Sequence, residues 1–193
     1  DVIATPNYGS DYSAGGFLLK NSNVAYRIVW GYKDLNENLI LGSPSNSATV
    51  YNNSITTNCV VNLNFSIPDV ITNTNYFYQV YRTGVFSGTI DTSGPTPVVT
   101  PPVDPGDEMY LVMETPITTN DLDPILNPSR EISITDITPE SFRQAGALLY
   151  TNGISGDGIE QANEKPPFAQ DIALYKQYTF YANTRTVHRF YLS

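Results

Sequence analysis

Short stretches of alternating apolar and polar residues run through most of the chain, with the two-residue period of a β-strand. In the clearest stretch, 59–67, five apolar residues share one face and three polar residues share the other, with Val60 as the exception. Pro68 follows directly and ends the pattern. Such a strand packs one face against a core and turns the other toward solvent.

The same alternation predicts strands in both halves of the chain. Residues 25–33 alternate around Tyr26, Ile28 and Trp30, and a polar turn at 34–38 leads into the return strand of a hairpin. The turn at 34–38, the break at 42–45 and the glycine-rich stretch 152–158 separate neighbouring stretches. The further predicted strands are 17–20, 39–41, 48–51, 76–83, 84–92 (as a hairpin partner), 109–113, 131–135, 171–175, 179–182 and 186–192.

Only one helix is predicted, at 139–148. Thr138 is the expected N-cap, Pro139 suits the first helical position, and Glu140 lies in the first turn. Gly146 limits the length of this helix. The sequence therefore predicts an all-β protein with one short helix and a β-meander at its end.

The segment 93–107 interrupts the strands with five prolines and two glycines. Proline lacks the backbone N–H that a β-ladder needs, so we expect an extended connector or a loop lying over a sheet edge. The chain begins with Asp1, and its last predicted strand ends at the final residue. We therefore expect it to be a processed product or a piece of a longer protein.

Composition and charge narrow the classes of function. The 193 residues include 14 tyrosines and only 15% charged residues, and the net charge is -9. A negative surface repels phosphate, which argues against sequence-specific binding of nucleic acid. It also suits a conduit through which DNA slides without adhering, although a need for solubility explains the charge equally well. No apolar stretch reaches the roughly 20 residues of a membrane span.

Candidate chemistry is sparse. Cys59 is the only cysteine, so no intrachain disulfide forms, and its alternating context predicts a small core residue. His188 is the only histidine, which excludes a multi-histidine metal site within one chain. There is no G-x-S-x-G elbow, phosphate loop or dinucleotide fingerprint. We accordingly predict no catalytic, cofactor-binding or metal-binding residue, and no enzyme.

Two groups of residues remain as candidates for a functional surface. The tyrosines Tyr76, Tyr78 and Tyr81 fit core or interface packing, or a platform on which sugars stack. The acidic residues of the loops around 104–123 fit an inter-subunit or lumen-facing surface, or the paired acids of a glycan hydrolase. These acidic residues are Asp104, Asp107, Glu108, Asp121 and Asp123.

Part of the chain resembles immunoglobulin-like sandwich modules of the fibronectin type III kind. Residues 25–50, AYRIVWGYKDLNENLILGSPSNSATV, resemble the last two strands of such a module, and 58–83 followed by 109–135 resemble the opening and middle strands of a second one. The resemblance implies a partial sandwich at 1–57 and a second sandwich-like module at 58–138. The short helix and β-meander predicted from the pattern form the third part, 139–193.

A more specific resemblance covers residues 148–189. A Leu-Tyr-Thr-Asn stretch, an Asn-x-x-Pro-Pro turn and an Asp-Ile-Ala-x-Tyr-Lys strand followed by Phe-x-Ala-Asn look like a segment of bacteriophage virion proteins, at the entry to a β-propeller-like domain in tail tubular or nozzle proteins. The resemblance implies a virion location, a ring of identical copies, contacts with portal, adaptor or tail components, and transient passage of DNA. The alternative is a receptor- or carbohydrate-binding adhesin module.

Overall fold

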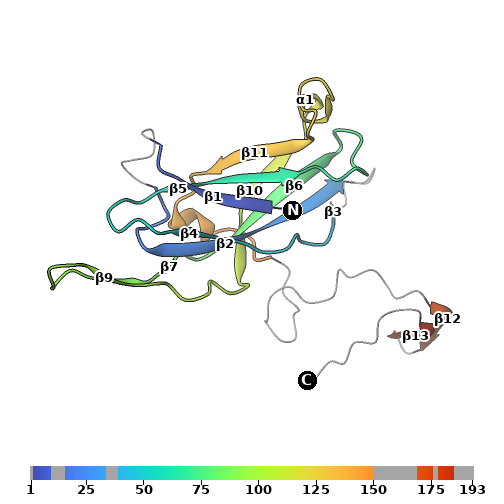
Figure 1. Cartoon of the computed structure of the whole chain (residues 1–193). Helices are drawn as coiled ribbons and strands as arrows, with labels where there is room; N and C mark the ends of the chain where they lie inside the picture. The colour runs from blue at the N-terminus through green and yellow to red at the C-terminus, as the bar shows by residue number, and fades with distance from the viewer. Residues whose placement is uncertain (1, 10–15, 34–38, 150–168, 176–177, 185–193) are drawn as a thin grey trace. The chain divides into compact units, whose positions relative to one another are not determined.

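The computed structural model describes residues 2–9, 16–33, 39–149, 169–175 and 178–184. The chain divides into two compact units, Asp1–Ala162 and Asn163–Ser193 (Figure 1). Strands dominate the described residues of both units, which confirms the predicted all-β class.

The described strands of the first unit form two main antiparallel sheets and one separate hairpin. One main sheet has three strands in the order β1 (Val2–Asn7), β5 (Val60–Ser66) and β11 (Glu131–Asp136). The other has six strands along the path β10-β6-β2-β3, with β4 and β7 also paired to β2. Its strands are β2 (Ser22–Lys33), β3 (Leu39–Leu41), β4 (Ala48–Asn52), β6 (Tyr76–Thr83), β7 (Phe86–Ser87) and β10 (Met109–Pro116). The separate hairpin consists of β8 (Thr89–Asp91) and β9 (Val98–Thr100).

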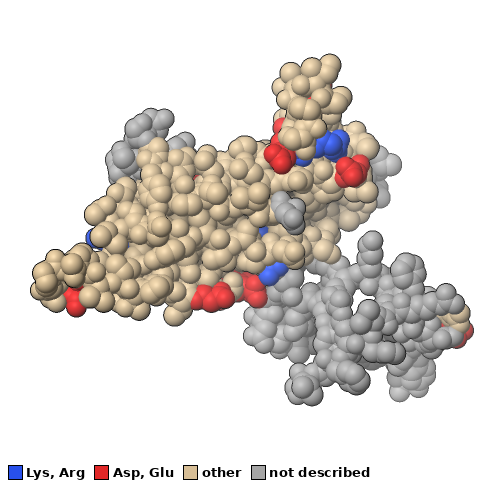
Figure 2. Space-filling view, in the orientation of Figure 1, with Lys and Arg blue, Asp and Glu red and all other residues tan. Residues whose placement is uncertain are grey.

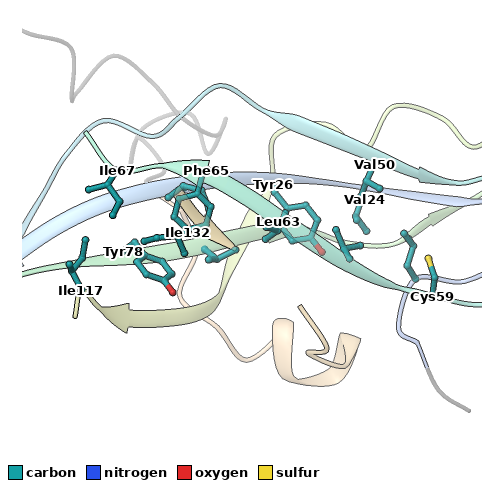
Figure 3. Packing of buried hydrophobic residues seen from close by; sticks show 14 of the residues in the cluster. Val24, Tyr26, Val50, Cys59, Leu63, Phe65, Ile67, Tyr78, Ile117 and Ile132 are labelled. Carbon is teal, nitrogen blue, oxygen red and sulfur yellow. The ribbon is translucent and has the colours of Figure 1, made fainter. Parts of the chain in front are cut away.

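The main core lies between the two sheets, which makes the unit a β-sandwich. The apolar face predicted for 59–67 is buried as a whole, and Cys59 is buried with it. Across from this face lie alternate residues of β2 and β6, including Ile28, Tyr78 and Val80. Figure 3 shows the cluster, with Leu63 and Phe65 of β5 near its middle. Residues of both halves of the chain therefore build one core.

Strands β2 and β6 are buried on both faces. A second, smaller cluster on the outer face of the large sheet contains Ala25, Val29, Tyr81, Met109 and Leu149. The segment leading to Leu149 runs beside β10, where the Leu111 N–H donates to the Ala147 carbonyl and the Leu149 N–H donates to the Met109 carbonyl. Because both faces of these strands are covered, their sequences carry large side chains at successive positions.

The strand pairing differs from the division into two modules at residue 57. β1 pairs with β5 from Val2↔Phe65 to Asn7↔Val60, and β2 pairs with β6 from Tyr26↔Arg82 to Tyr32↔Tyr76. Segments 1–57 and 58–138 thus contribute neighbouring strands to the same two sheets. Segment 1–57 supplies four of the nine described strands of these sheets and segment 58–138 supplies five, so both segments build one sandwich.

Several local elements also differ from the predictions. The expected helix at 139–148 is the four-residue α2 (Glu140–Arg143), with Pro139 at its N-cap in place of Thr138. A second short helix, α1 (Thr119–Leu122), was not predicted. Residues 84–92 do not pair with β6: β7 pairs with β2, and β8 pairs with β9 inside the proline-rich segment. Alternation identifies a strand but not its partner.

The second unit contains one described hairpin, β12 (Ala169–Tyr175) paired with β13 (Tyr178–Thr184). It agrees with the first two strands predicted for the terminal meander. The third predicted strand, 186–192, lies outside the described residues, as does His188. Among the helices that the structure describes, none is long and apolar enough to cross a membrane.

Candidate functional site

A buried arginine is the most unusual polar feature of the sandwich. Arg82 follows Tyr78 and Val80 at two-residue intervals along β6, so its side chain enters the space between the sheets. It is fully buried and ranks first by volume among such side chains. A guanidinium cannot lose its charge inside a protein, so its surroundings must compensate that charge.

The compensation comes from the strand and turn that lie across the sandwich. Arg82 Nη1 donates to Asp136 Oδ2 over 2.6 Å and to the Thr138 carbonyl over 2.9 Å. The Thr138 N–H in turn donates to Asp136 Oδ1 over 2.8 Å. Both side chains of the pair are buried, which makes the Arg82–Asp136 bridge a charge-assisted contact in a dry environment.

Two aromatic side chains complete the surroundings of this pair. The Tyr26 hydroxyl donates to Asp136 Oδ2 over 2.8 Å, and the Phe17 ring lies 3.7 Å from Arg82 Cζ. Burial, followed by the negative charge of Asp136, holds the pKa of Tyr26 well above its ordinary value. Tyr26 is therefore a neutral hydrogen-bond donor. Arg82 Nε has no hydrogen-bond partner in the described structure.

The network continues to the surface through α2. Arg82 Nη2 lies 3.3 Å from Glu140 Oε2, and Glu140 Oε1 accepts from Arg143 Nε and Nη2, each over 2.7 Å. Arg143 Cζ lies 4.8 Å from the centroid of the Tyr110 ring on β10. The short helix thus contacts two neighbouring strands of the large sheet, β6 and β10, and the alternating charges along the network match a structural role.

The candidate tyrosines do not form one exposed platform. Tyr78 is buried in the main core, edge-on to the rings of Trp30 and Phe65 at centroid distances of 5.8 and 5.2 Å. Tyr81 is buried on the opposite face of the sheet, where its hydroxyl donates to Gln79 Oε1. Only Tyr76 lies partly exposed, and its ring centroid is 5.4 Å from that of its cross-strand neighbour Tyr32.

The acidic candidates at 104–108 each have a hydrogen-bond or ion-pair partner. Asp104 accepts from the Gly106 N–H, and Asp107 forms a 2.9 Å ion pair with Arg27. Glu108 accepts from the Tyr110 hydroxyl over 2.7 Å. These three carboxylates stabilise the turn that leads into β10.

The acidic candidates at 121–123 organise a different loop. Asp121 forms a capping box with Thr118 at the start of α1, and Asp123 accepts from the Ile125 N–H over 2.7 Å. This loop follows the end of β10, whereas 104–108 precede its start. Eight residues of extended chain span roughly 25 Å, so the fold separates the two sets instead of bringing them together.

Two buried asparagines that were not predicted from the sequence also stabilise the fold. Asn52 is fully buried, and its Nδ2 donates to the carbonyls of Leu18, Leu19 and Thr57 over 3.0–3.1 Å. Asn21 adopts a φ of 47° and is also fully buried. Asparagine tolerates this left-handed region better than most residues, but nothing in the local pattern distinguishes these two positions from the many other asparagines.

The Cys59 thiol and the possible metal ligands also give no sign of a reactive site within the described residues. Burial raises the pKa of the Cys59 thiol to about 11, which keeps it protonated at neutral pH and unreactive. Within the described ranges, no three His, Cys, Asp or Glu side chains gather closely enough to hold a metal ion. Comparison of the chain with protein-family models, curated proteins and solved structures finds no match in any of the three.

Proposed function

We propose that this chain is a structural component of a multi-copy assembly, specifically the tail of a tailed bacteriophage, where it contributes to the tail tube, nozzle or portal-proximal ring that conducts DNA. The proposal rests on the resemblance of residues 148–189 to phage virion segments and on the character of the sandwich. The polar side chains that sequence analysis selected hold turns, caps and strands in place.

The main observation in favour of an assembly role is that two projecting segments expose large apolar side chains. The β8–β9 hairpin and the loop after α1 both extend from the sandwich (Figure 1). Val98 on the hairpin is 64% exposed, and Ile125 on the loop is 86% exposed. Large apolar side chains held outward by ordered structure favour contact with other protein surfaces.

The distribution of charged side chains on the surface is consistent with contacts to other protein copies. Figure 2 shows a face on which most of the described surface is uncharged and acidic side chains occur in small, separate groups. Protein contacts exclude charge from their centres, and a net charge of -9 repels passing DNA. The same chain therefore combines uncharged contact surfaces with overall repulsion of nucleic acid.

The test is the mass and shape of the purified full chain. We expect mass photometry to show closed multimers and negative-stain images to show rings. A matched measurement uses the double variant Asp121→Asn and Asp123→Asn, which should assemble like the wild type. A stable monomer that hydrolyses a glycan, and loses this activity in the double variant, contradicts the proposal.

A second candidate function, carbohydrate binding, is favoured by the Tyr32–Tyr76 pair. The two rings meet where β2 ends and β6 begins, with an interplanar angle of 52°, and Tyr32 is exposed. A glycan array separates the two functions: an adhesin gives specific binding that Tyr76→Ala removes, whereas an assembly component gives none. Tyr51→Ala, which removes an exposed tyrosine elsewhere on the sandwich, is the control.

A further inference from the structure

The loop between β10 and β11 presents a tip of apolar side chains. The tip consists of residues 124–128, with the sequence Pro-Ile-Leu-Asn-Pro, and in Figure 1 the loop that contains α1 stands out from the sandwich. Ile125 is 86% exposed, the highest value for a large apolar side chain among the described residues, and Leu126 is 65% exposed. Both prolines are exposed as well. Apolar residues gathered on an ordered, exposed segment mark a site of contact with protein or with lipid.

Every backbone N–H group of the tip has an acceptor within the loop. The two prolines have no N–H. The N–H groups of Ile125 and Leu126 donate to Asp123 Oδ1 over 2.7 and 3.4 Å. The Asn127 N–H donates to the Asp123 carbonyl over 2.8 Å. An unpaired N–H would oppose transfer of the tip into an environment without water, and this pairing removes that obstacle.

The one polar side chain of the tip points back into the loop. Asn127 Nδ2 donates to the carbonyls of Asp121 and Glu131, each over 3.0 Å. Asn127 Oδ1 accepts from the Glu131 N–H over 3.1 Å. The side chains on the outside of the tip are therefore hydrocarbon throughout, namely Ile125, Leu126 and the two proline rings.

The loop is fixed at both of its ends. Thr118 and Asp121 form the capping box at its start. Near its other end, Arg130 Nη2 donates to the carbonyls of Pro68 and Ile71 in the connection between β5 and β6, over 3.3 and 2.7 Å. Arg130 has a φ of 51°, a conformation that a non-glycine residue keeps only when its surroundings hold it. A loop ordered in advance loses little conformational entropy when its tip is buried.

The size and shape of the tip favour lipid over protein. A standard protein contact takes about 20–30 residues from each partner, whereas the tip offers the five residues 124–128. A projecting tip needs a pocket of matching shape in a protein, but the acyl chains of a bilayer adapt to it. Binding of such a segment to a membrane grows with the apolar area that it buries. The β8–β9 hairpin then remains for the protein contacts of the assembly.

Charge selects the class of lipid. In Figure 2 the outer part of the loop is uncharged and charged side chains lie at its base. Residues 124–129 contain no charged side chain, whereas Asp121, Asp123 and Glu131 flank them and the whole chain has a net charge of -9. An anionic membrane repels this charge. The outermost group of a zwitterionic phospholipid is a cationic amine, which complements the acidic base of the loop.

We propose that the tip 124–128 inserts into the surface of a zwitterionic phospholipid bilayer, with Ile125 and Leu126 among the acyl chains and the acidic base of the loop at the headgroups. This inference does not rest on the proposed assembly function, since a single copy makes the contact. We expect one copy to bind weakly, because even a single myristoyl chain binds with an association constant of only about 10⁴ M⁻¹. Several copies facing one membrane bind more tightly through avidity.

A fluorophore attached to the tip of the full chain tests the insertion. Leu126→Cys labelled with the polarity-sensitive dye nitrobenzoxadiazole reports on the tip. Val98→Cys with the same label is the matched control, because Leu126 and Val98 are 65% and 64% exposed. Cys59 is buried and is left unlabelled. We expect phosphatidylcholine vesicles, at up to roughly 10 mM lipid, to raise the emission severalfold and shift it to the blue at position 126 and not at position 98.

Two further measurements identify the cause of the response. Ile125→Asp in the chain labelled at position 126 should abolish it, whereas Val103→Asp, which adds the same charge at another exposed aliphatic residue, should leave it unchanged. Circular dichroism should show the same fold for both variants, because both side chains are exposed. Phosphatidylglycerol vesicles at low salt should give a smaller response than phosphatidylcholine vesicles, because their charge repels the chain.

Other outcomes overturn the proposal. No response at position 126 shows that the tip does not insert, and an equal response at position 98 shows adsorption without a specific site. A response that grows with protein concentration in the absence of vesicles assigns the tip to a second copy of the chain instead of lipid. A larger response to phosphatidylglycerol than to phosphatidylcholine contradicts the proposed lipid class. The assembly function is tested separately by the mass of the chain without vesicles, so that either proposal fails without the other.

Discussion

Arg82 and Asp136 form a 2.6 Å ion pair that joins the two sheets of the sandwich from within. Arg82 belongs to β6 of the large sheet and Asp136 to β11 of the small sheet, and both side chains are buried. A charge removed from water is costly unless its partners are in place. The pair therefore favours one relative placement of the two sheets.

Removing one partner of this pair should be strongly destabilising. Asp136→Asn leaves the Arg82 guanidinium without its buried counter-ion, and we expect the free energy of unfolding to fall by about 3–5 kcal/mol. Asp107→Asn is the control, because Asp107 pairs with Arg27 at an exposed site, and such pairs are worth about 0–1 kcal/mol. Urea denaturation measures both. Equal losses in the two variants contradict this account.

The Tyr26 hydroxyl should contribute a measurable part of the same network. Tyr26→Phe removes the hydrogen bond to Asp136 but keeps the ring in the core, and we expect a loss of about 1–2 kcal/mol. Tyr110→Phe removes a comparable bond to Glu108 at the surface and should cost less than about 0.5 kcal/mol. The comparison uses thermal or urea unfolding. A larger loss of stability in Tyr110→Phe than in Tyr26→Phe would contradict this prediction.

Asn52 offers a test that changes almost no atoms. In Asn52→Asp, a carboxylate oxygen replaces the amide nitrogen that faces the carbonyls of Leu18, Leu19 and Thr57. Oxygen then faces oxygen in a buried site, so we expect a loss of about 3 kcal/mol or more near neutral pH. Asn53→Asp makes the same change at the exposed neighbouring position and should be nearly neutral. Urea titration followed by circular dichroism measures the free energy of unfolding of both variants. Similar stabilities would show that the buried hydrogen bonds of Asn52 do not stabilise the fold.

Stability should decline at alkaline pH because of Cys59. Burial raises the pKa of its thiol from 9.0 to about 11, so above pH 9 the unfolded chain loses this proton before the folded chain does. The stabilisation that comes from the protonated thiol is complete below pH 9 and is lost between pH 9 and 11. At pH 10 the loss amounts to about 1.4 kcal/mol. Cys59→Ala should remove this part of the pH dependence. Parallel wild-type and variant stability curves from pH 8 to 10 would show that the thiol is not responsible.

Tyr26 should add a second alkaline loss at higher pH. Its pKa is raised well above 10.0 by burial and by Asp136, so tyrosinate formation in the unfolded chain lowers stability from about pH 10 upward. Tyr26→Phe removes this part and leaves the loss between pH 9 and 10 in place. We expect Cys59→Ala to abolish only the loss that begins at pH 9 and Tyr26→Phe only its own part of the loss above pH 10. If either variant abolished the entire alkaline decline, one residue would account for both losses.

Local pattern was sufficient for most individual strands. The alternation of 59–67 predicted which residues of β5 face the core, and the bounds of β6 at 76–83 agree with the structure. Cys59 was expected in the core and is buried there. These predictions succeed because side-chain direction alternates along any extended strand, whatever its partners are.

Pairing and site geometry depended on the tertiary structure. No local signal shows that β1 pairs with β5 and β2 with β6, and so the two segments looked like parts of separate modules. The tyrosines at 78 and 81 looked like one cluster, yet they point to opposite faces of a sheet that is covered on both sides. The partner of Arg82 lies 54 residues away along the chain, and only the packing of the sheets brings Asp136 to it. The sequence alone determined most of the strands, though not β1 or β9, and which side of a strand is apolar, because these depend on neighbours along the chain. Which strands meet, which charges pair and which edges stay open depend on contacts between distant residues, and only the folded structure decides them.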